Sequence, residues 1–292
     1  MTSLRQWKAF AGQIYRLLSG MHRRFRGRKP AKSLPILVIG SMRVGGGGKT
    51  PVVEWMARHF LEAAILVHPT PDEQVLLEEE FPGRVFAHRS LVNGWKRAQK
   101  AGFAWAISDG GFQDPRLEKG ALILVVNEMI PQDVAQMLPF GHWRELDGVN
   151  RAQMSLKNAD IPDLDESPCL KYRWKPFISG DKAPTSAVLA CGVGRPEGVR
   201  EDLAGLGCQI VAEYRVRDHG GFSVARMREI SRCHPGFPWV ATKKDLPRWP
   251  KGQELPRLLE REWVPEEPES LLEWVKKHPA LGILEYGETE IA

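Results

Sequence analysis

Residues 34–51 read LPILVIGSMRVGGGGKTP, and this stretch decides the fold of the chain. It opens with a short apolar run rich in branched residues, which predicts a buried strand over residues 34–39. A glycine-rich loop and a Lys-Thr pair follow, and residues 52–60 carry apolar side chains at helical spacing. A strand, a glycine loop and a helix in this order predict a phosphate-binding loop in an α/β protein.

The residue types in the loop suit the binding of a nucleoside triphosphate. Consecutive glycines let backbone N–H groups curl round phosphate oxygens, Lys49 reaches the β and γ phosphates, and the Thr50 hydroxyl is a ligand for Mg²⁺. The usual pattern has a glycine six residues before the lysine, where this chain has Arg43. The alternative is a glycine-rich turn followed by a chance Lys-Thr pair. The residues expected to bind nucleotide are Arg43, Val44, Gly45, Gly46, Gly47, Gly48, Lys49 and Thr50.

Strand-like segments recur downstream of the loop. We expect strands over residues 64–67, 84–87, 103–108 and 121–126, with helical stretches between several of them, and therefore a mostly parallel sheet with covering helices. Ligands of such sheets bind beyond the carboxyl ends of the strands. Asp109 closes the third of these strands, so we expect it near Thr50 as the second anchor for Mg²⁺. The alternative for Asp109 is a carboxylate that caps the turn before Gly110.

The second half of the chain predicts a smaller α/β unit. Residues 151–185 are polar and punctuated by prolines, which predicts a linker or lid. Strand-like and helical segments then alternate as far as residue 242, with a glycine turn but no second Lys-Thr loop. We therefore expect four parts: an amphipathic helix with a basic tail (1–33), a P-loop nucleotide-binding domain (34–150), a linker or lid (151–185) and a second α/β domain (186–292).

Composition narrows the class of protein. The chain has 292 residues, of which 42% are hydrophobic, and its 4 cysteines are too widely spaced for a zinc site or a disulfide scaffold. The net charge of +5 is unevenly distributed: 11 of the 41 Lys and Arg residues precede the first acidic residue, Glu54, which leaves 30 basic residues against 36 acidic ones in the rest. A basic head on an acidic body is unlike the uniform basic coat of a nucleic-acid binder, so no nucleic acid is expected as a partner.

The N-terminal segment predicts an amphipathic helix. Its apolar residues recur at helical spacing, and basic residues fall largely between them. Two interpretations stay open: the helix lies in the headgroup layer of an anionic membrane, or it packs on the domain with its basic face solvated. No apolar run approaches the roughly 18 residues needed to span a bilayer, and we expect the protein on the cytoplasmic side. The apolar positions are Leu4, Trp7, Phe10, Ile14, Leu17, Leu18, Met21 and Phe25.

Seven short segments, taken in order, match the motifs of one known family. They are GSMRVGGGGKTP (40–51), PDEQ (71–74), DGGFQDPRL (109–117), LPFGHWRE (138–145), GVGRP (192–196), DH (218–219) and TKKD (242–245). In these segments the chain resembles the tetraacyldisaccharide 4′-kinases of lipid A biosynthesis. The phosphate loop of that family also lacks the early glycine, so Arg43 is no longer an objection to a phosphate loop.

The resemblance implies ATP-dependent phosphorylation of the 4′ position of a tetraacyl glucosamine disaccharide 1-phosphate, a lipid A precursor. It implies that Asp72 and His219 form an acid–base pair that activates the sugar hydroxyl. Lys49 and Thr50 would handle the phosphates and Mg²⁺, and Asp109 would help to hold the metal. With a lipid as substrate, the anionic surface of the inner membrane, on its cytoplasmic face, becomes the favoured partner of the N-terminal helix.

The chain departs from the family pattern at several positions. Gly110 stands where the family has a second acidic residue, Asp114 where it has a histidine, and Lys243 where it has a glutamate. The family's SRGYG segment is missing between Val67 and Asp72. The alternative function is therefore a membrane-associated nucleotide-binding homologue that has lost or changed kinase activity. The sequence leaves the oligomeric state open.

Overall fold

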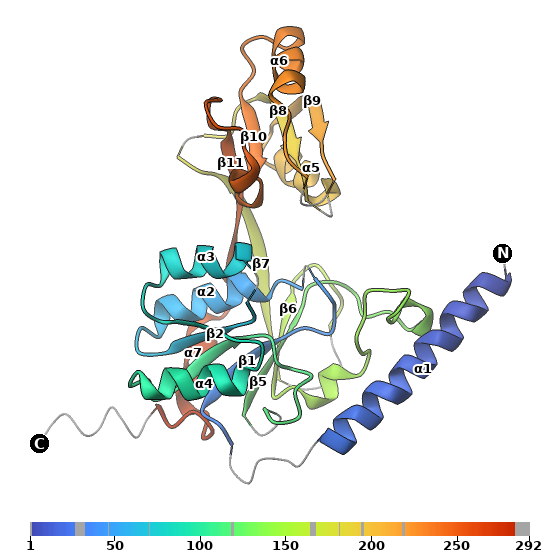
Figure 1. Cartoon of the computed structure of the whole chain (residues 1–292), viewed down its shortest axis with the longest axis vertical. Coiled ribbons are helices and arrows are strands. Elements are labelled where there is room, and N and C mark those ends of the chain that lie inside the picture. Colours follow the sequence, from blue (N-terminus) through green and yellow to red (C-terminus); the bar gives the residue numbers. More distant parts are fainter. Residues whose placement is uncertain are drawn as a thin grey trace, which may run out of the picture. The chain divides into compact units, whose positions relative to one another are not determined.

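The computed structural model describes residues 2–26, 33–45, 47–69, 71–117, 120–163, 168–180, 182–193, 196–217 and 220–283. The chain forms two compact units (Figure 1). Unit 1 comprises Met1–Arg173 and Trp263–Ala292, and unit 2 comprises Trp174–Glu262. The chain passes between them along two strands, β7 (Cys169–Ile178) and β11 (Arg257–Pro265). Unit 2 is therefore an insertion in unit 1.

A parallel sheet forms the centre of unit 1. Its strands follow the order β3-β2-β4-β1-β5-β6-β7, and the neighbouring strands from β3 to β7 pair in parallel. The mostly parallel α/β sheet predicted from the sequence is thus confirmed. The strands not yet bounded are β1 (Ile36–Gly40), β2 (Ala64–Val67), β3 (Val85–Ala87), β4 (Ala106–Asp109), β5 (Ala121–Val126) and β6 (Met154–Asn158).

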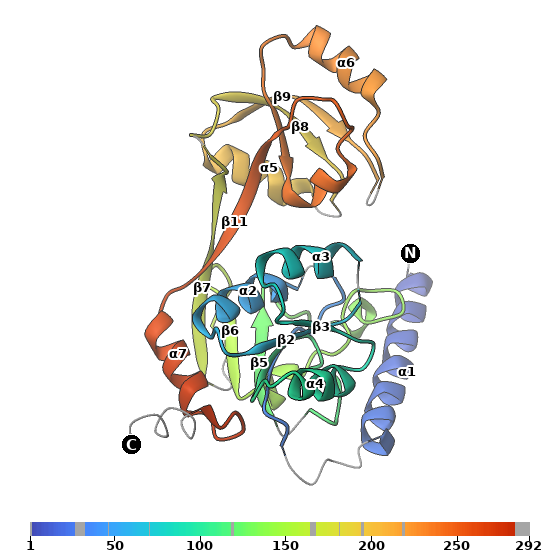
Figure 2. The same ribbon diagram turned by 60° about the vertical axis from the view of Figure 1, so that its left-hand side comes forward.

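Helices cover both faces of this sheet. α2 (Lys49–His59) and α4 (Leu91–Lys100) lie on opposite sides of it (Figures 1 and 2). The chain crosses from β1 to β2 in one direction and from β3 to β4 in the other, so right-handed crossovers place the two helices on different faces. α3 (Pro71–Glu80) follows β2, and α7 (Pro268–Lys277) follows β11.

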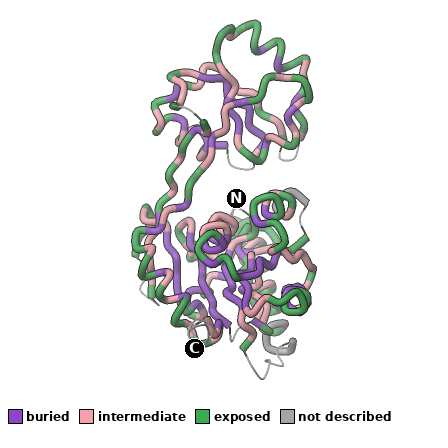
Figure 3. The backbone as a smooth tube through the Cα atoms, turned by 90° about the vertical axis from the view of Figure 1, so that its left-hand side faces the viewer, coloured by how far each residue is buried: buried purple, intermediate pink, exposed green. Residues whose placement is uncertain are grey.

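Burial follows the central strands, as Figure 3 shows. β1 and β5 are buried along their whole length, which explains why both read as uninterrupted apolar runs. α2 adds Val52, Val53 and Met56 to the buried residues. The phosphate loop between β1 and α2 is therefore held at both ends by buried elements.

The N-terminal helix α1 (Thr2–Arg26) packs on unit 1 beside the short helix η1 (Val134–Gln136) (Figures 1 and 2). A second short helix, η2 (Gly148–Arg151), precedes β6. None of the helices within the described ranges combines the length and the apolarity that a membrane span requires.

Unit 2 contains a smaller parallel sheet. Its strands follow the order β11-β10-β8-β9, with β8 (Ser186–Cys191), β9 (Gln209–Arg215) and β10 (Trp239–Thr242). α5 (Pro196–Gly205) connects β8 with β9, α6 (Val224–Cys233) connects β9 with β10, and η3 (Lys243–Arg248) follows β10. The second α/β unit predicted from the sequence is present.

The limits of the units differ from those expected. Residues 151–185, expected as a linker or lid, contain β6 and β7, and residues 263–292 belong to unit 1 rather than to a second domain. Lys157 explains part of the difference, because its amine donates to the Ile161 carbonyl at 2.7 Å and to Asp163 at 2.6 Å while its side chain is only 1% exposed. A buried strand can contain a lysine whose amine is fully hydrogen-bonded, and its sequence then resembles that of a polar linker.

Candidate active site

The phosphate loop joins the carboxyl end of β1 to the first turn of α2. Gly45 and Gly48 adopt positive φ angles of 67° and 73°, a region that favours glycine, and Gly48 is the N-cap of α2. Lys49 and Thr50 are the first residues of that helix. Since the first N–H groups of a helix lack partners within it, the loop presents donors at the point where phosphate oxygens are expected.

Gly47 makes the closest approach within the loop. A Cβ atom at this position would lie 2.3 Å from Ser41 Oγ and 2.7 Å from Ser41 Cβ, well inside van der Waals contact. Ser41 cannot easily move away, because its hydroxyl accepts a hydrogen bond from the Arg43 N–H at 3.1 Å. The loop can therefore keep this curvature only with glycine at position 47.

Lys49, Thr50 and Asp109 converge at the carboxyl edge of the sheet. The parallel register pairs Ile39 with Asp109, so the last residue of β4 lies beside the start of the loop. The Thr50 hydroxyl donates to Asp109 Oδ2 at 2.7 Å, and Lys49 Nζ lies 3.9 Å from Asp109 Oδ1. The structure thus brings together three of the residues predicted from the sequence.

This cluster fits a Mg²⁺ ion that is shared with a nucleotide. A hydroxyl and a carboxylate already in contact are the oxygen ligands that Mg²⁺ prefers, and Mg²⁺ is commonly held by one or two such groups together with substrate phosphates and water. Among the described residues, no group of three or more His, Cys, Asp or Glu gathers into a separate metal centre. Thr50 and Asp109 are the residues that would hold the ion.

Arg43 was expected to bind nucleotide, but in the structure its side chain pairs with an acidic residue of the protein. Its guanidinium forms an ion pair with Glu128, which follows β5. Its backbone pairs with Trp143, and the neighbouring Val44 N–H donates to the His142 carbonyl at 2.8 Å. The segment that carries the LPFGHWRE motif is therefore hydrogen-bonded to the first residues of the phosphate loop.

A polar network centred on the buried Glu145 contacts Ser41 at the start of the loop, and sequence reasoning assigned it no role. Gln113 donates to the Ser41 carbonyl at 3.0 Å and to Glu145 at 2.9 Å. Glu145, only 3% exposed, also pairs with Arg151, whose guanidinium lies over the Phe112 ring at 4.6 Å and donates to the Phe112 carbonyl at 3.2 Å. The one available signal was that Gln113 and Glu145 belong to two of the quoted motifs.

The departures from the family pattern have visible structural consequences. Gly110 has a φ of 97°, so the backbone itself disfavours a side chain where the family has its second acidic residue. Asp114 is paired with Arg116 at 2.6 Å.

The ring of His68 lies close to Gly110, 3.9 Å from the position that a Cβ atom of residue 110 would take. Partial burial lowers the pKa of His68, and the opposing pull of the nearby Asp109 carboxylate is the next largest influence.

Several predicted site residues lie outside what the structure describes. Gly46 and His219 are outside the described residues. Asp72 lies in the first turn of α3, and its side chain is outside the described part of the chain. The pairing of Asp72 with His219 therefore stays a prediction.

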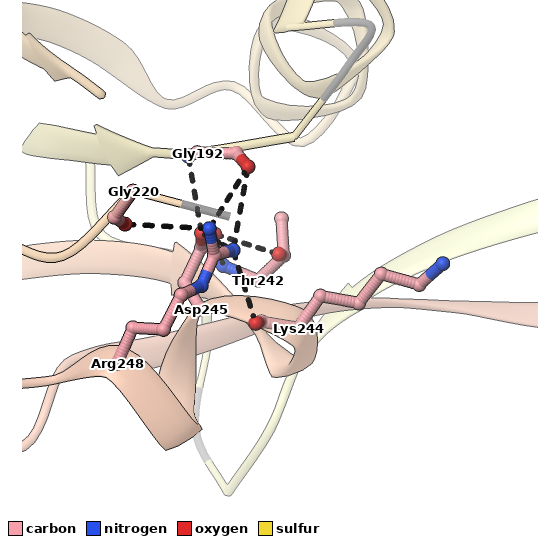
Figure 4. A network of polar contacts seen from close by, with 6 residues as sticks. All are labelled: Gly192, Gly220, Thr242, Lys244, Asp245 and Arg248. Carbon is pink, nitrogen blue, oxygen red and sulfur yellow. Dashed lines mark hydrogen bonds and ion pairs between the residues drawn. The ribbon is translucent and has the colours of Figure 1, made fainter. Parts of the chain in front are cut away.

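The glycine turn and the TKKD motif of unit 2 meet at a buried carboxylate (Figure 4). Asp245 is fully buried and accepts hydrogen bonds from the Gly192 N–H at 3.0 Å and from the Thr242 hydroxyl at 2.7 Å. Arg248 pairs with the same carboxylate at 2.9 Å and donates to the carbonyls of Gly192 and Gly220 at 3.3 and 3.4 Å. One ion pair thus fixes the turn that follows β8 and the flank of the loop that carries the DH motif.

Comparison with known proteins assigns the chain to one protein family. The family model of the tetraacyldisaccharide-1-P 4′-kinases, LpxK, matches residues 5–69 and 67–278. The chain belongs to this family. Tetraacyldisaccharide 4′-kinases of Rhodospirillum centenum and Chlamydia caviae are 29% and 26% identical to it, over 85% and 73% of this chain and 85% and 72% of their own. The resemblance expected from the motifs is confirmed. The low identities are those of a divergent member of the family.

A solved structure supports the same fold. The crystal structure of the "apo" form of LpxK from Aquifex aeolicus in complex with ATP superposes with a TM-score of 0.69 and 19% sequence identity, over 94% of this chain and 99% of that chain. Membership of the tetraacyldisaccharide-1-P 4′-kinase family favours an ATP-dependent kinase over a homologue that binds nucleotide without turnover.

Gly47→Ala should weaken ATP binding by at least tenfold, because the new Cβ atom forces Ser41 or the loop to move. Adding Ser41→Gly removes both clashing atoms and should restore part of the affinity. Titration of the three variants with a fluorescent ATP analogue measures this effect. Unchanged affinity in Gly47→Ala would contradict the packing argument.

Asp245→Ala should lower the free energy of unfolding of unit 2 by about 3 kcal/mol, since it leaves Arg248 and the Gly192 N–H without their shared acceptor. The matched control is Arg226→Ala, which breaks an exposed ion pair with Glu229 in the same unit and should cost less than about 1 kcal/mol. Hydrogen exchange of residues 186–217, followed by mass spectrometry, compares the two variants. Equal protection in both would count against the role of Asp245.

Proposed function

We propose that this protein transfers the γ-phosphate of ATP to the 4′ hydroxyl of a tetraacyl glucosamine disaccharide 1-phosphate in lipid A biosynthesis. Family membership supports the reaction. The observation that carries the proposal is the contact of Thr50 and Lys49 with Asp109 at the first turn of α2. This chain keeps the groups that hold a triphosphate despite its departures elsewhere in the motifs.

The phosphate loop positions ATP and neutralises its charge. The N–H groups at the start of α2 and the Lys49 ammonium bind phosphate oxygens, and Asp109 orients the lysine and the Thr50 hydroxyl. Mg²⁺, held by Thr50 and Asp109, would supply further neutralisation of charge on the transferred group. Phosphoryl transfer depends mainly on such positioning and electrostatic stabilisation, so the loop supplies most of what the donor side requires.

On the acceptor side we assign the acid–base pair to Asp72 and His219. A carboxylate paired with an imidazole can accept the proton that the sugar hydroxyl loses on attack. The two residues correspond to the family's motifs at PDEQ and DH. Asp72 belongs to the helix that follows β2, a strand next to β4 and Asp109 in the sheet. This order in the sheet supports a role for Asp72 near the transferred phosphoryl group.

We further propose that α1 binds the cytoplasmic face of the inner membrane. Its large apolar side chains face solvent: Trp7 and Leu17 are 66% and 67% exposed, and Leu4, Phe10, Ile14, Leu18 and Met21 are exposed as well. The apolar face of the helix therefore points away from the rest of unit 1, against which Gly12 and Tyr15 pack. A contiguous exposed apolar face on a protein with a lipid acceptor fits a membrane surface.

The kinase assignment predicts a simple pattern of activity. Incubation with ATP, Mg²⁺ and the disaccharide 1-phosphate should add one phosphate to the lipid, as detected by mass spectrometry. Lys49→Ala should abolish turnover. Asp72→Asn should lower kcat by about 100-fold and leave ATP affinity unchanged, because a general base acts on the acceptor. The control Glu79→Gln changes an exposed carboxylate of the same helix and should be silent. Bound ATP without any transfer would favour the non-catalytic homologue.

The membrane assignment predicts that replacing Trp7 and Leu17 with serine weakens binding to vesicles of phosphatidylethanolamine and phosphatidylglycerol by about 100-fold, from about 3 kcal/mol of lost apolar burial. Gln13→Ser, at another exposed position of α1, is the control. Flotation on a density gradient measures binding, and circular dichroism checks that the helix forms. Equal flotation of the double variant and the control would refute membrane binding by α1.

A further inference from the structure

The helix α1 has two faces with different tasks. At about 100° per residue, the exposed apolar residues cluster on one side of the helix, whereas Arg5, Gly12 and Arg16 lie on nearly the opposite side. These three residues contact the rest of unit 1, at Asp133, Val134 and Asp147. The helix can therefore be docked on the protein and exposed to a membrane at the same time.

Gly12 provides the closest contact of the docked face. A Cβ atom at this position would lie 2.1 Å from the Val134 carbonyl oxygen, and a backbone atom in η1 cannot swing aside as a side chain can. The contact therefore brings the backbone of α1 against the backbone of η1. Gly20, two turns further along the same helix, has no atom within 4 Å of a Cβ position. The close approach is thus local to Gly12.

Ion pairs lie on both sides of this contact. Arg5 donates to Asp133 at 2.8 Å, and Arg16 lies 4.0 Å from Asp147. Asp133 also accepts from the Ala135 N–H at 2.9 Å as the N-cap of η1, and this hydrogen bond, followed by the one from Arg5, lowers the pKa of Asp133. Tyr15 packs against the hydrophobic core of unit 1. α1 is therefore held at several points along its length.

The docked segment leads directly to the phosphate loop. Trp143 donates to the Gln136 carbonyl at 3.1 Å and accepts from the Leu138 N–H at 2.9 Å, so η1 and the LPFGHWRE segment are hydrogen-bonded together. The backbone of Trp143 also pairs with that of Arg43, and the Arg144 N–H donates to the Met42 carbonyl at 2.7 Å. A short chain of backbone contacts thus connects Gly12 with the loop expected to hold ATP.

We propose that the docking of α1 through Gly12 holds the phosphate loop at a fixed height and orientation relative to the bilayer, so that the phosphate donor can reach an acceptor embedded in the membrane. The proposal rests on the proposed kinase activity and membrane binding. It goes beyond them because a helix on a loose tether would bind vesicles equally well. Docking is then required for phosphorylation at the bilayer but not for vesicle binding or ATP binding.

The test compares Gly12→Leu with Gly20→Leu. Both substitutions add the same side chain to one helix and raise its helix propensity equally, but only the first meets the Val134 carbonyl. Each variant is assayed for flotation with phosphatidylethanolamine and phosphatidylglycerol vesicles, for ATP affinity, and for kcat/KM with the acceptor in those vesicles and in detergent micelles. Gly12→Ala and Gly20→Ala serve as a second pair if the Gly12→Leu variant does not fold.

We expect Gly12→Leu to lose at least tenfold in kcat/KM on vesicles and at most threefold in micelles, whose detergent molecules can rearrange around the protein. Its flotation and ATP affinity should stay within twofold of those of Gly20→Leu. Equal kcat/KM of the two variants on vesicles would overturn the proposal, and so would an equal loss in vesicles and micelles. If the unmodified protein neither floats nor phosphorylates the acceptor, the proposed function itself has failed, which separates the two cases.

Discussion

The site depends on the parallel pairing of β1 with β4. This register sets Ile39 beside Asp109, and only then can one carboxylate contact both the Thr50 hydroxyl and the Lys49 ammonium. The loop that leaves β1 contributes the cations and N–H donors, and the neighbouring strand contributes the anion that orients them. β1 and its other neighbour β5 are buried along their whole length, so a shift in register would force close-packed side chains on both faces of the sheet to repack.

The central strands of the sheet and the phosphate loop were the elements most readily predicted from the sequence. The strands that became β1, β2, β4 and β5 are apolar on both faces, so their sequences stand out as short hydrophobic runs. The phosphate loop was predictable from its glycines, since only glycine tolerates the φ angles and the close approach found there. Residues 151–185 gave no such signal. β7 alternates between partly buried and exposed residues, and β6 hides a lysine whose partners come from a later turn.

The polar contacts around the loop could not be derived from the sequence. Gln113, Glu145 and Arg151 meet only because the segments after β4 and β5 fold back under Ser41, and nothing in local spacing predicts that. The same limit applied to α1. An amphipathic pattern states that two faces differ in polarity, but it does not state which one packs on the protein. Gly12 decides this in the structure, because it lets the backbone of the helix approach η1 and so leaves the apolar face outward.

The uneven charge of the chain takes on a physical meaning from these contacts. Three of the basic residues that precede Glu54 are paired with acidic residues far along the chain: Arg5 with Asp133, Arg16 with Asp147 and Arg43 with Glu128. The exposed pairs on α1 contribute little stability by themselves, but they favour one orientation of the helix over its rotation about its own axis. Part of the basic head is therefore matched to the acidic body. The exposed face of α1 is apolar, so the membrane binding that we propose for it would depend on burial of hydrophobic area more than on charge.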